Sequence, residues 1–213
     1  MSTIKFIYFD AANTLIHKPE LWKKINEVLT KYGHTVNAAE LKKKHKFTSE
    51  KIKFPDNTSK DFYNIFNKEL LSALGVNSNE EILNDIYNAC TYLPWQKFDD
   101  VTFLKEIELP IGIISNFNSS LKEKINNIIS VPFSEFIISE DVTVAKPDPG
   151  IFEFAINKIG LPPEEILFIG DSIFLDIEPA KKIGMKAYLI DRDNVYPTYQ
   201  DRISSLEELK HLI

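Results

Sequence analysis

The chain of 213 residues has little cysteine, no excess of positive charge and no long apolar run. Its single cysteine, Cys90, excludes an intramolecular disulfide and any metal site built from several cysteines, and it favours a reducing compartment. The net charge of -6 argues against general nucleic-acid binding, because affinity for the phosphate backbone comes from clustered Lys and Arg. No apolar run approaches the roughly 18 residues of a membrane span, and the N-terminus lacks a signal-sequence pattern. These absences predict a cytoplasmic protein whose partners are small molecules or proteins, with no nucleic acid and no membrane among them.

What the chain does have is a series of short apolar runs rich in β-branched and aromatic residues. Runs that are apolar at nearly every position predict strands covered on both faces, and therefore parallel strands. They lie at Lys5 to Phe9, Ile111 to Ser115, Phe136 to Ser139, Ile166 to Ile169 and Ala187 to Ile190. Helical patterns separate the later runs, over Ser119 to Ile129, Pro149 to Ile159 and Leu175 to Ile183. Strands alternating with helices predict an α/β fold with a doubly wound parallel sheet.

Residues 16–92 follow a different pattern. This stretch has no convincing strand, but apolar residues recur at helical spacing in two series, Leu21, Ile25, Val28, Leu29, Tyr32 and Phe62, Ile65, Phe66, Leu70, Leu71, Leu74. We therefore expect a core of residues 1–15 and 93–213 and an all-helical insertion of residues 16–92. The aromatic residues of the insertion either line a substrate site or pack its own small core, and these include Trp22, Tyr32, Phe47 and Phe54.

Polar residues stand just beyond the ends of the predicted strands. In an open parallel sheet, ligands bind beyond the carboxyl ends of the strands. These positions hold Asp10, Ser115, Asn116, Asp171 and Asp176, and Lys146 precedes the next helix. Each residue alone has an ordinary explanation as a helix cap, a turn residue or an exposed side chain. Their occurrence together, in order along one sheet, favours a functional site.

Phosphoryl transfer is the chemistry that needs this set. A carboxylate attacks phosphorus only where the charge on the phosphate oxygens is neutralised, because two anions repel each other. A Mg²⁺ ion on Asp10 and Asp171, together with the ammonium of Lys146 and the hydroxyl of Ser115, would supply that charge and those donors. Asp176 is placed to orient Lys146 or to hold a water on the metal. The amide of Asn116 is a candidate for substrate binding, with turn stabilisation as the alternative.

Four segments, in order, resemble the motifs of the haloacid dehalogenase-like (HAD) hydrolase superfamily. They are Phe9 to Leu15, Ile114 to Asn116, Lys146-Pro147 and Gly170 to Asp176. The resemblance implies a Rossmann-like core with a helical cap inserted between the first two motifs. It implies that Asp10 is the nucleophile that becomes an aspartyl phosphate and that Ser115 binds phosphate. By the same likeness Lys146 steadies both groups, and Asp171 binds Mg²⁺.

The chain departs from the superfamily at Ala12. Phosphatases of the superfamily carry a second aspartate at this position, whose side chain protonates the leaving group and then helps to deprotonate the hydrolytic water. The backbone carbonyl of the same residue contacts Mg²⁺. Ala12 therefore keeps the expected metal ligand and removes the general acid and base, a group that typically contributes about 10²–10⁴ in rate.

Three functions are compatible with this pattern. The first is a Mg²⁺-dependent phosphatase for a small phosphorylated metabolite, either slow or selective for good leaving groups such as acyl or aryl phosphates. The second is a phosphonate or 2-haloacid hydrolase, because those members of the superfamily also lack the second aspartate. Dehalogenases, however, have the motif of Asp171 and Asp176 altered, and no lysine of the insertion stands out as a Schiff-base former. The third is a catalytically impaired protein that binds phosphate or another protein.

Overall fold

The computed structural model describes residues 3–213, and the chain divides into two compact units. The first unit, which we call the core, comprises the described residues 3–17 and Lys97–Ile213. The second, which we call the cap, comprises Lys18–Gln96. These limits lie a few residues beyond the expected ones. The short strands β2 (Ile16–His17) and β3 (Gln96–Lys97) pair in a two-stranded sheet where the chain leaves and re-enters the core.

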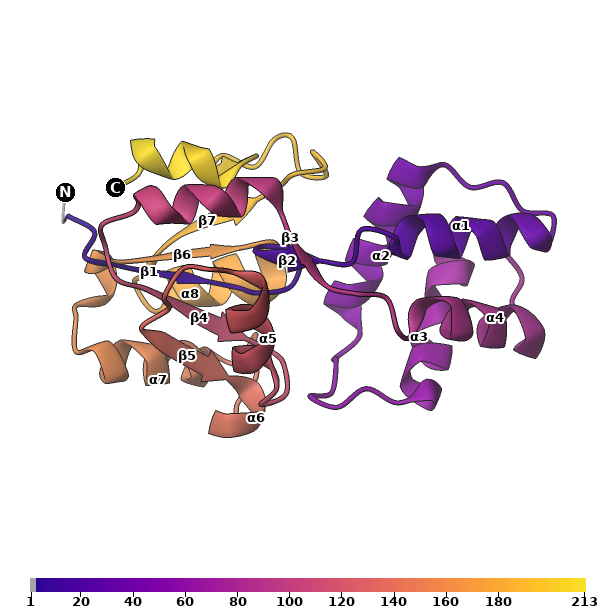
Figure 1. Cartoon of the computed structure of the whole chain (residues 1–213), viewed down its shortest axis with the longest axis horizontal. Helices are drawn as coiled ribbons and strands as arrows, with labels where there is room; N and C mark the ends of the chain where they lie inside the picture. Colours follow the sequence, from indigo (N-terminus) through magenta and orange to yellow (C-terminus); the bar gives the residue numbers. More distant parts are fainter. Residues whose placement is uncertain (1–2) are drawn as a thin grey trace. The chain divides into compact units, whose positions relative to one another are not determined.

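The core is built on a six-stranded sheet in the order β5-β4-β1-β6-β7-β8 (Figure 1). Every neighbouring pair of strands is parallel. The strands are β1 (Phe6–Phe9), β4 (Ile111–Ser115), β5 (Glu135–Ile138), β6 (Ile166–Gly170), β7 (Lys186–Ile190) and β8 (Arg202–Ile203). The chain runs outward from β1 through β4 to β5, and then from β6 on the other side of β1 to β8. The predicted doubly wound α/β fold is confirmed, and its switch in strand order lies beside β1, where ligands bind in folds of this class.

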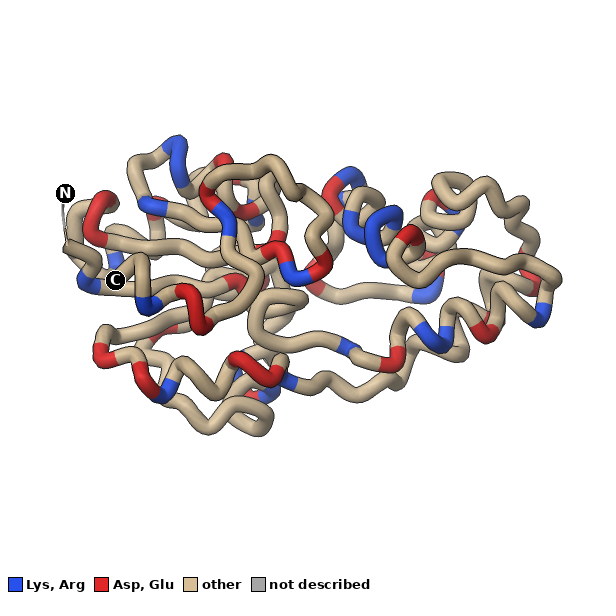
Figure 2. The backbone as a smooth tube through the Cα atoms, turned by 90° about the horizontal axis from the view of Figure 1, so that it is seen from above, with Lys and Arg blue, Asp and Glu red and all other residues tan. Residues whose placement is uncertain are grey.

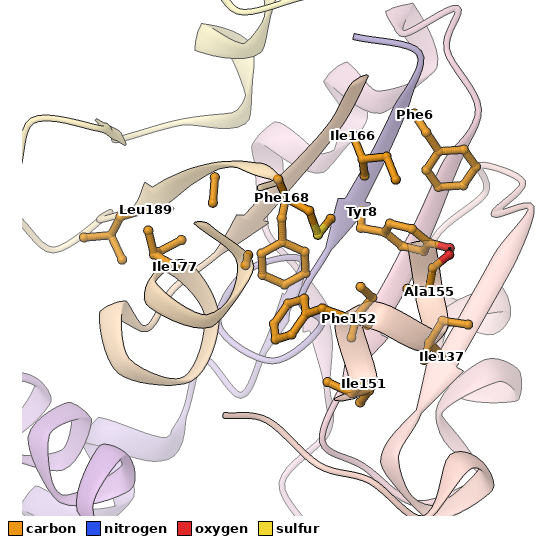
Figure 3. Packing of buried hydrophobic residues seen from close by; sticks show 14 residues of the cluster. Phe6, Tyr8, Ile137, Ile151, Phe152, Ala155, Ile166, Phe168, Ile177 and Leu189 are labelled. Carbon is orange, nitrogen blue, oxygen red and sulfur yellow. The ribbon is translucent and has the colours of Figure 1, made fainter. Parts of the chain in front are cut away.

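Both faces of the sheet are covered, as continuously apolar strands require. One face carries Phe6 and Tyr8 of β1 with Phe168 of β6, packed against Phe152 and Ala155 of a helix (Figure 3). Side chains alternate along a strand, so the intervening residues of β1 point to the opposite face, and they too are completely buried. The carboxyl ends of β1, β4 and β6 are thereby held in register at one edge of a rigid core.

The helical elements of the core are η1 (Asp99–Glu106), α5 (Leu121–Ile128), α6 (Ser139–Val142), α7 (Pro149–Ile159), η2 (Pro163–Glu165), η3 (Ile173–Ile177), α8 (Glu178–Lys182) and η4 (Leu206–His211). Of these, α5 and α7 begin and end near the residues that the sequence predicts. The helix expected over Leu175 to Ile183 is instead a π-helical turn, η3, followed by α8. The N–H of Ile177 donates to the carbonyl of Ser172 at 3.1 Å, the wide spacing that defines this turn.

The cap consists of four helices, α1 (Leu21–Lys31), α2 (Ala38–Lys51), α3 (Lys60–Ala73) and α4 (Glu80–Cys90). Side chains of Asn37, Ser59 and Asn79 cap the N-termini of α2, α3 and α4. The sequence leaves open whether four aromatic residues of the cap line a substrate site or pack its interior. Three of them pack against the cap's own apolar cluster, namely Trp22, Tyr32 and Phe54.

Two features of the helices concern their charge and their length. Figure 2 shows the lysines of α2 as a blue band along that helix. Among residues 3–213, no helix combines the length and apolar character that crossing a membrane requires.

Candidate active site

The first strand delivers Asp10 to the carboxyl edge of the sheet. Its N–H continues the pairing with β6 by donating to the carbonyl of Ile169 at 2.8 Å. Asp10 is 6% exposed, and its Oδ1 accepts a hydrogen bond from Oγ of Ser115 at 3.3 Å. Because Ser115 is the last residue of β4, two neighbouring strands meet at this carboxylate.

Lys146 lies between two buried carboxylates. Its Nζ donates to Oδ1 of Asp10 at 2.7 Å and to Oδ1 of Asp176 at 2.6 Å. Lys146 is 4% exposed and Asp176 only 1%. Two carboxylates against one ammonium leave an uncompensated negative charge in a desolvated site. Such a charge is costly unless a further cation or a proton balances it.

Asp176 is held in place by the chain that precedes it. Its Oδ2 accepts from the backbone N–H of Ser172 at 3.0 Å, so the carboxylate folds back over the turn after β6. This close approach requires glycine at position 170. A Cβ there would stand 2.5 Å from the Cβ, Cγ and Oδ2 atoms of Asp176. The sequence identified Gly170 and Asp176, but not the donor function of the Ser172 backbone, because a backbone contact leaves no residue-type signal.

Asp171 completes a group of carboxylates that fits a divalent cation. One carboxylate oxygen from each of Asp10, Asp171 and Asp176 lies within 4.8 Å of the other two. Both oxygens of Asp176 are engaged by Lys146 and Ser172, and among residues 3–213 Oδ2 of Asp10 makes no hydrogen bond. Asp10 and Asp171 are the pair that the resemblance assigns to a metal, and the grouping of the carboxylates is compatible with that assignment. Hard oxygen donors in excess negative charge suit Mg²⁺, which takes one or two carboxylates and keeps other positions for water and substrate.

The protonation states reflect this crowding. The pKa of the Asp10 carboxyl is raised to about 7, chiefly by burial; Lys146 opposes this rise, and the negative charges of Asp176 and Asp171 add to it. Burial also raises the pKa of Asp176, against the lowering effect of Lys146. For Lys146, burial alone would lower the pKa, but the two carboxylates outweigh burial and leave it above its ordinary value. The lysine therefore stays cationic, and one more positive charge would favour ionised Asp10.

The Asn116 side chain is bound to the backbone of Lys146. Its Nδ2 donates to the Lys146 carbonyl at 2.8 Å, and its Oδ1 accepts from the Lys146 N–H at 2.7 Å. Both ends of the amide are thus engaged, and the pair of bonds ties the lysine's loop to the end of β4. Of the two alternatives for Asn116, this geometry favours structural stabilisation over substrate binding.

Ala12 lies in a tight turn directly after Asp10. The carbonyl of Ala11 accepts from the N–H groups of Leu15 and Ile16 at 2.9 and 3.0 Å, and the N–H of Asn13 donates to the carbonyl of Ile16 at 2.7 Å. Asn13 adopts a positive φ of 61°, a conformation that asparagine tolerates better than most residues. The turn presents a methyl group at position 12, which can neither donate nor accept a proton.

Comparison with known proteins points to one family. The sequence profile described as haloacid dehalogenase-like hydrolase matches residues 4–184. Among curated proteins, the chain is 31% identical over 141 residues to haloacid dehalogenase-like hydrolase domain-containing protein 3 of Danio rerio, a match covering 61% of this chain and 58% of the relative. It is 33% identical over 125 residues to an (S)-2-haloacid dehalogenase of Pseudomonas putida, covering 57% of this chain and 55% of the relative.

A phosphatase is similar to the same degree. Glyceraldehyde 3-phosphate phosphatase of Methanocaldococcus jannaschii is 32% identical over 120 residues, covering 52% of this chain and 51% of the relative. The matches thus span about half the length of these curated relatives. Among solved structures, the putative HAD-hydrolase YfnB of Bacillus subtilis, bound to magnesium, covers 99% of both chains with a TM-score of 0.67 at 20% identity.

Proposed function

The chain belongs to the haloacid dehalogenase-like hydrolase family, and from that premise we propose that it is a Mg²⁺-dependent phosphatase lacking the usual general acid and base. The observation that carries the proposal is the buried cluster in which Lys146 bridges Asp10 and Asp176, with Asp171 alongside. A cluster with more carboxylates than cations is suited to a ligand that brings in positive charge. The substrate we propose is a small phosphorylated metabolite.

Each residue of the cluster has a defined task in this proposal. A carboxylate oxygen of Asp10 forms a bond to phosphorus while the bond from phosphorus to the leaving oxygen breaks. Ser115 and Lys146 stabilise the phosphate oxygens, and Asp176 holds the Lys146 ammonium toward Asp10. Asp10 and Asp171 would hold Mg²⁺, with the carbonyl of Ala12 as the family likeness implies, and the ion would neutralise phosphate charge. Water then attacks the aspartyl phosphate and releases phosphate and free Asp10.

Ala12 affects both halves of this reaction. In the first half the leaving oxygen must take its proton from water or depart as an anion, so acyl and aryl phosphates should react faster than alkyl phosphates. In the second half the attacking water loses a positioned base. If hydrolysis of the intermediate is the slower half, aspartyl phosphate accumulates and the reaction begins with a burst.

The proposal predicts burst kinetics with an aryl phosphate. Mixing the protein with p-nitrophenyl phosphate and Mg²⁺ should release close to one equivalent of nitrophenol per site before a slow steady state. Asp10→Asn should abolish the burst, whereas Asp99→Asn, at an exposed position of the core, should keep it. The absence of any nitrophenol release with Mg²⁺ would contradict the proposal. So would turnover that is unaffected by removal of Mg²⁺ with a chelator.

Dehalogenation is the second candidate, favoured by Ala12 and by the similarity to an (S)-2-haloacid dehalogenase. Asp10 would then attack carbon and displace halide, and the carboxylates of Asp171 and Asp176 would have no evident use. Halide release from an L-2-chloro acid, without phosphate release from any ester, would decide for this alternative. Phosphonate hydrolysis has less support. A Schiff-base lysine is commonly activated by burial, and among the described residues the cap buries no lysine.

A further inference from the structure

Arg192 joins three separate segments of the core beside the turn that carries Ala12. It follows β7 by two residues, and its side chain is 17% exposed. Its NH2 group donates to the carbonyl of Thr14 at 2.9 Å, and its NH1 group forms an ion pair with Asp100. The guanidinium carbon lies 4.1 Å from the centroid of the Phe98 ring, a stacked cation–π contact. Nothing in the sequence motifs points to this residue.

Two successive carbonyls of the turn are fixed by this arrangement. The carbonyl of Thr14 accepts from Arg192, and the carbonyl of Leu15 accepts from the N–H of Phe98 at 3.1 Å. Because Phe98 also packs under the guanidinium, both donors form one unit. The inner side of the turn is closed by its own hydrogen bonds to Ala11. From chain distant in sequence, Arg192 and Phe98 hold the turn at Thr14 and Leu15, and Ile16 at its end belongs to β2, which pairs with β3.

The guanidinium is itself anchored from behind. Oδ2 of Asp100, which pairs with Arg192, also accepts from the Leu206 N–H at 2.8 Å and from Oγ of Ser205 at 3.1 Å. The start of η4 thereby fixes the carboxylate, and the carboxylate fixes the fork of Arg192. Arginine suits this task because its planar group donates in two directions and stacks at the same time, which lysine does not.

The cluster leaves polar atoms unsatisfied. Among the described residues, Thr14 Oγ1, Asp100 Oδ1 and Arg192 Nε are buried without a hydrogen-bond partner. A buried donor or acceptor without a partner opposes folding. An arrangement selected only to stabilise the core would not need three such atoms at one place. This points to a requirement for geometry at the turn rather than for stability.

We propose that Arg192 is a positioning residue for the active-site turn, holding residues 11–16 so that Asp10 and the backbone of Ala12 keep their places at the sheet edge. The catalytic role given to this turn rests on the proposed function. The restraint of the turn by Arg192 does not depend on that function. Arg192→Lys should keep a cation for Asp100, but it should lose the simultaneous bond to Thr14 and the contact of the planar group with the Phe98 ring. Arg202→Lys is the matched control. Arg202 bonds Asp191 and Asn194 in the same C-terminal region and does not contact the turn.

Hydrogen exchange tests the restraint without substrate or metal. In Arg192→Lys the amides of Asn13, Leu15 and Ile16 should exchange about tenfold faster relative to the β6 amides, as expected for the loss of one charge-assisted hydrogen bond. In Arg202→Lys that ratio should not change. Equal ratios in the two variants would overturn the proposal. Should Arg192→Lys fail to fold, Asp100→Asn, which loosens the same fork, should raise the same ratio.

Activity separates this inference from the proposed function. If the protein hydrolyses p-nitrophenyl phosphate, Arg192→Lys should lower kcat about tenfold and leave KM within about twofold, because the turn carries the nucleophile and not the phosphate donors. A matching fall in Arg202→Lys would mean a structural effect only and would overturn the positioning role. If the wild-type protein shows no turnover, the proposed function fails, and the exchange ratio still decides the role of Arg192.

Discussion

The core and the cap differ in the kind of polar residue that each of them buries. The core buries Asp10, Lys146, Asp176 and Asp191, all ionisable. In the described part of the cap the buried polar residues are neutral, Thr48 and Asn67, and the interior is filled by aliphatic and aromatic side chains. Burying charge is costly unless partners are in place, so it is retained where chemistry needs it. The contrast supports placing the proposed reaction in the core. The cap's interior serves its own folding.

The largest expected effect comes from Asp10, the proposed nucleophile. Asp10→Asn should lower turnover by about 10⁴-fold or more, because it removes the attacking oxygen charge altogether. The substitution should not lower the Tm without ligand, since it relieves one of the two negative charges crowded around Lys146. Steady-state assays and thermal melts check both statements. Turnover that survives in Asp10→Asn would break the assignment of chemistry to this cluster.

Gly170→Ala comes next, because it attacks the geometry of the cluster without changing its charges. The added Cβ would stand 2.5 Å from Asp176, which must move away from Ser172 and Lys146. We expect a loss of about 1–3 kcal/mol in the free energy of unfolding from overpacking. Turnover should fall by about 10² from misplacement of the charged groups. Gly150→Ala is the control, since its Cβ would meet a single carboxylate oxygen of Asp148 at 3.1 Å, a much looser contact. Similar losses in both variants would contradict the special role of position 170.

Asn116→Ala should have a smaller effect on the same cluster. It removes both bonds to the Lys146 backbone, so the lysine's loop gains freedom and turnover should fall about tenfold. Asn118→Ala is the matched control, because the side-chain oxygen of Asn118 accepts hydrogen bonds from the N–H and Oγ of Ser120, within its own turn. If KM rises alone in Asn116→Ala and kcat does not change, Asn116 binds substrate after all.

The smallest effect on ligand binding is expected from the cap's interior. Phe66, which is 2% exposed, contacts the rings of His45 and Phe54. Phe66→Leu should destabilise the cap by about 1 kcal/mol. The rise in Tm produced by Mg²⁺ with beryllofluoride should not change, because these ligands bind core groups. A loss of that rise in Phe66→Leu would break the division of tasks between core and cap.

The parts predicted from sequence are those with a strong local signal. Continuously apolar strands such as β1 and β6 mark a buried parallel sheet, and polar residues at their ends mark the site edge. β8 was missed because two residues, Arg202 and Ile203, carry no periodic pattern. Residue spacing predicts a regular helix where the structure has the π-helical turn, because spacing does not depend on the backbone bond from the N–H of Ile177 to the carbonyl of Ser172.

The side-chain partners within the site were harder to predict. The strand-end rule selected Asn116, but it does not say whether an amide faces a ligand or the backbone of Lys146. Arg192 also stands at a strand end, yet the rule passed over it, because its value depends on partners as distant in sequence as Thr14 and Asp100. Such long-range contacts depend on the fold, and no regular pattern of residues along the sequence marks them.

Restoring the missing acid tests the central claim most directly. Ala12→Asp returns a carboxyl group to a site whose nucleophile, lysine and carboxylate cluster are otherwise assembled. We expect hydrolysis of an alkyl phosphate to rise by about 10²–10⁴, and hydrolysis of p-nitrophenyl phosphate to rise less in its burst phase, because nitrophenol leaves without a proton donor. The control Ala12→Asn adds similar bulk without an acid. Equal rates for wild type, Ala12→Asp and Ala12→Asn on the alkyl ester would contradict a phosphatase that lacks only its proton donor.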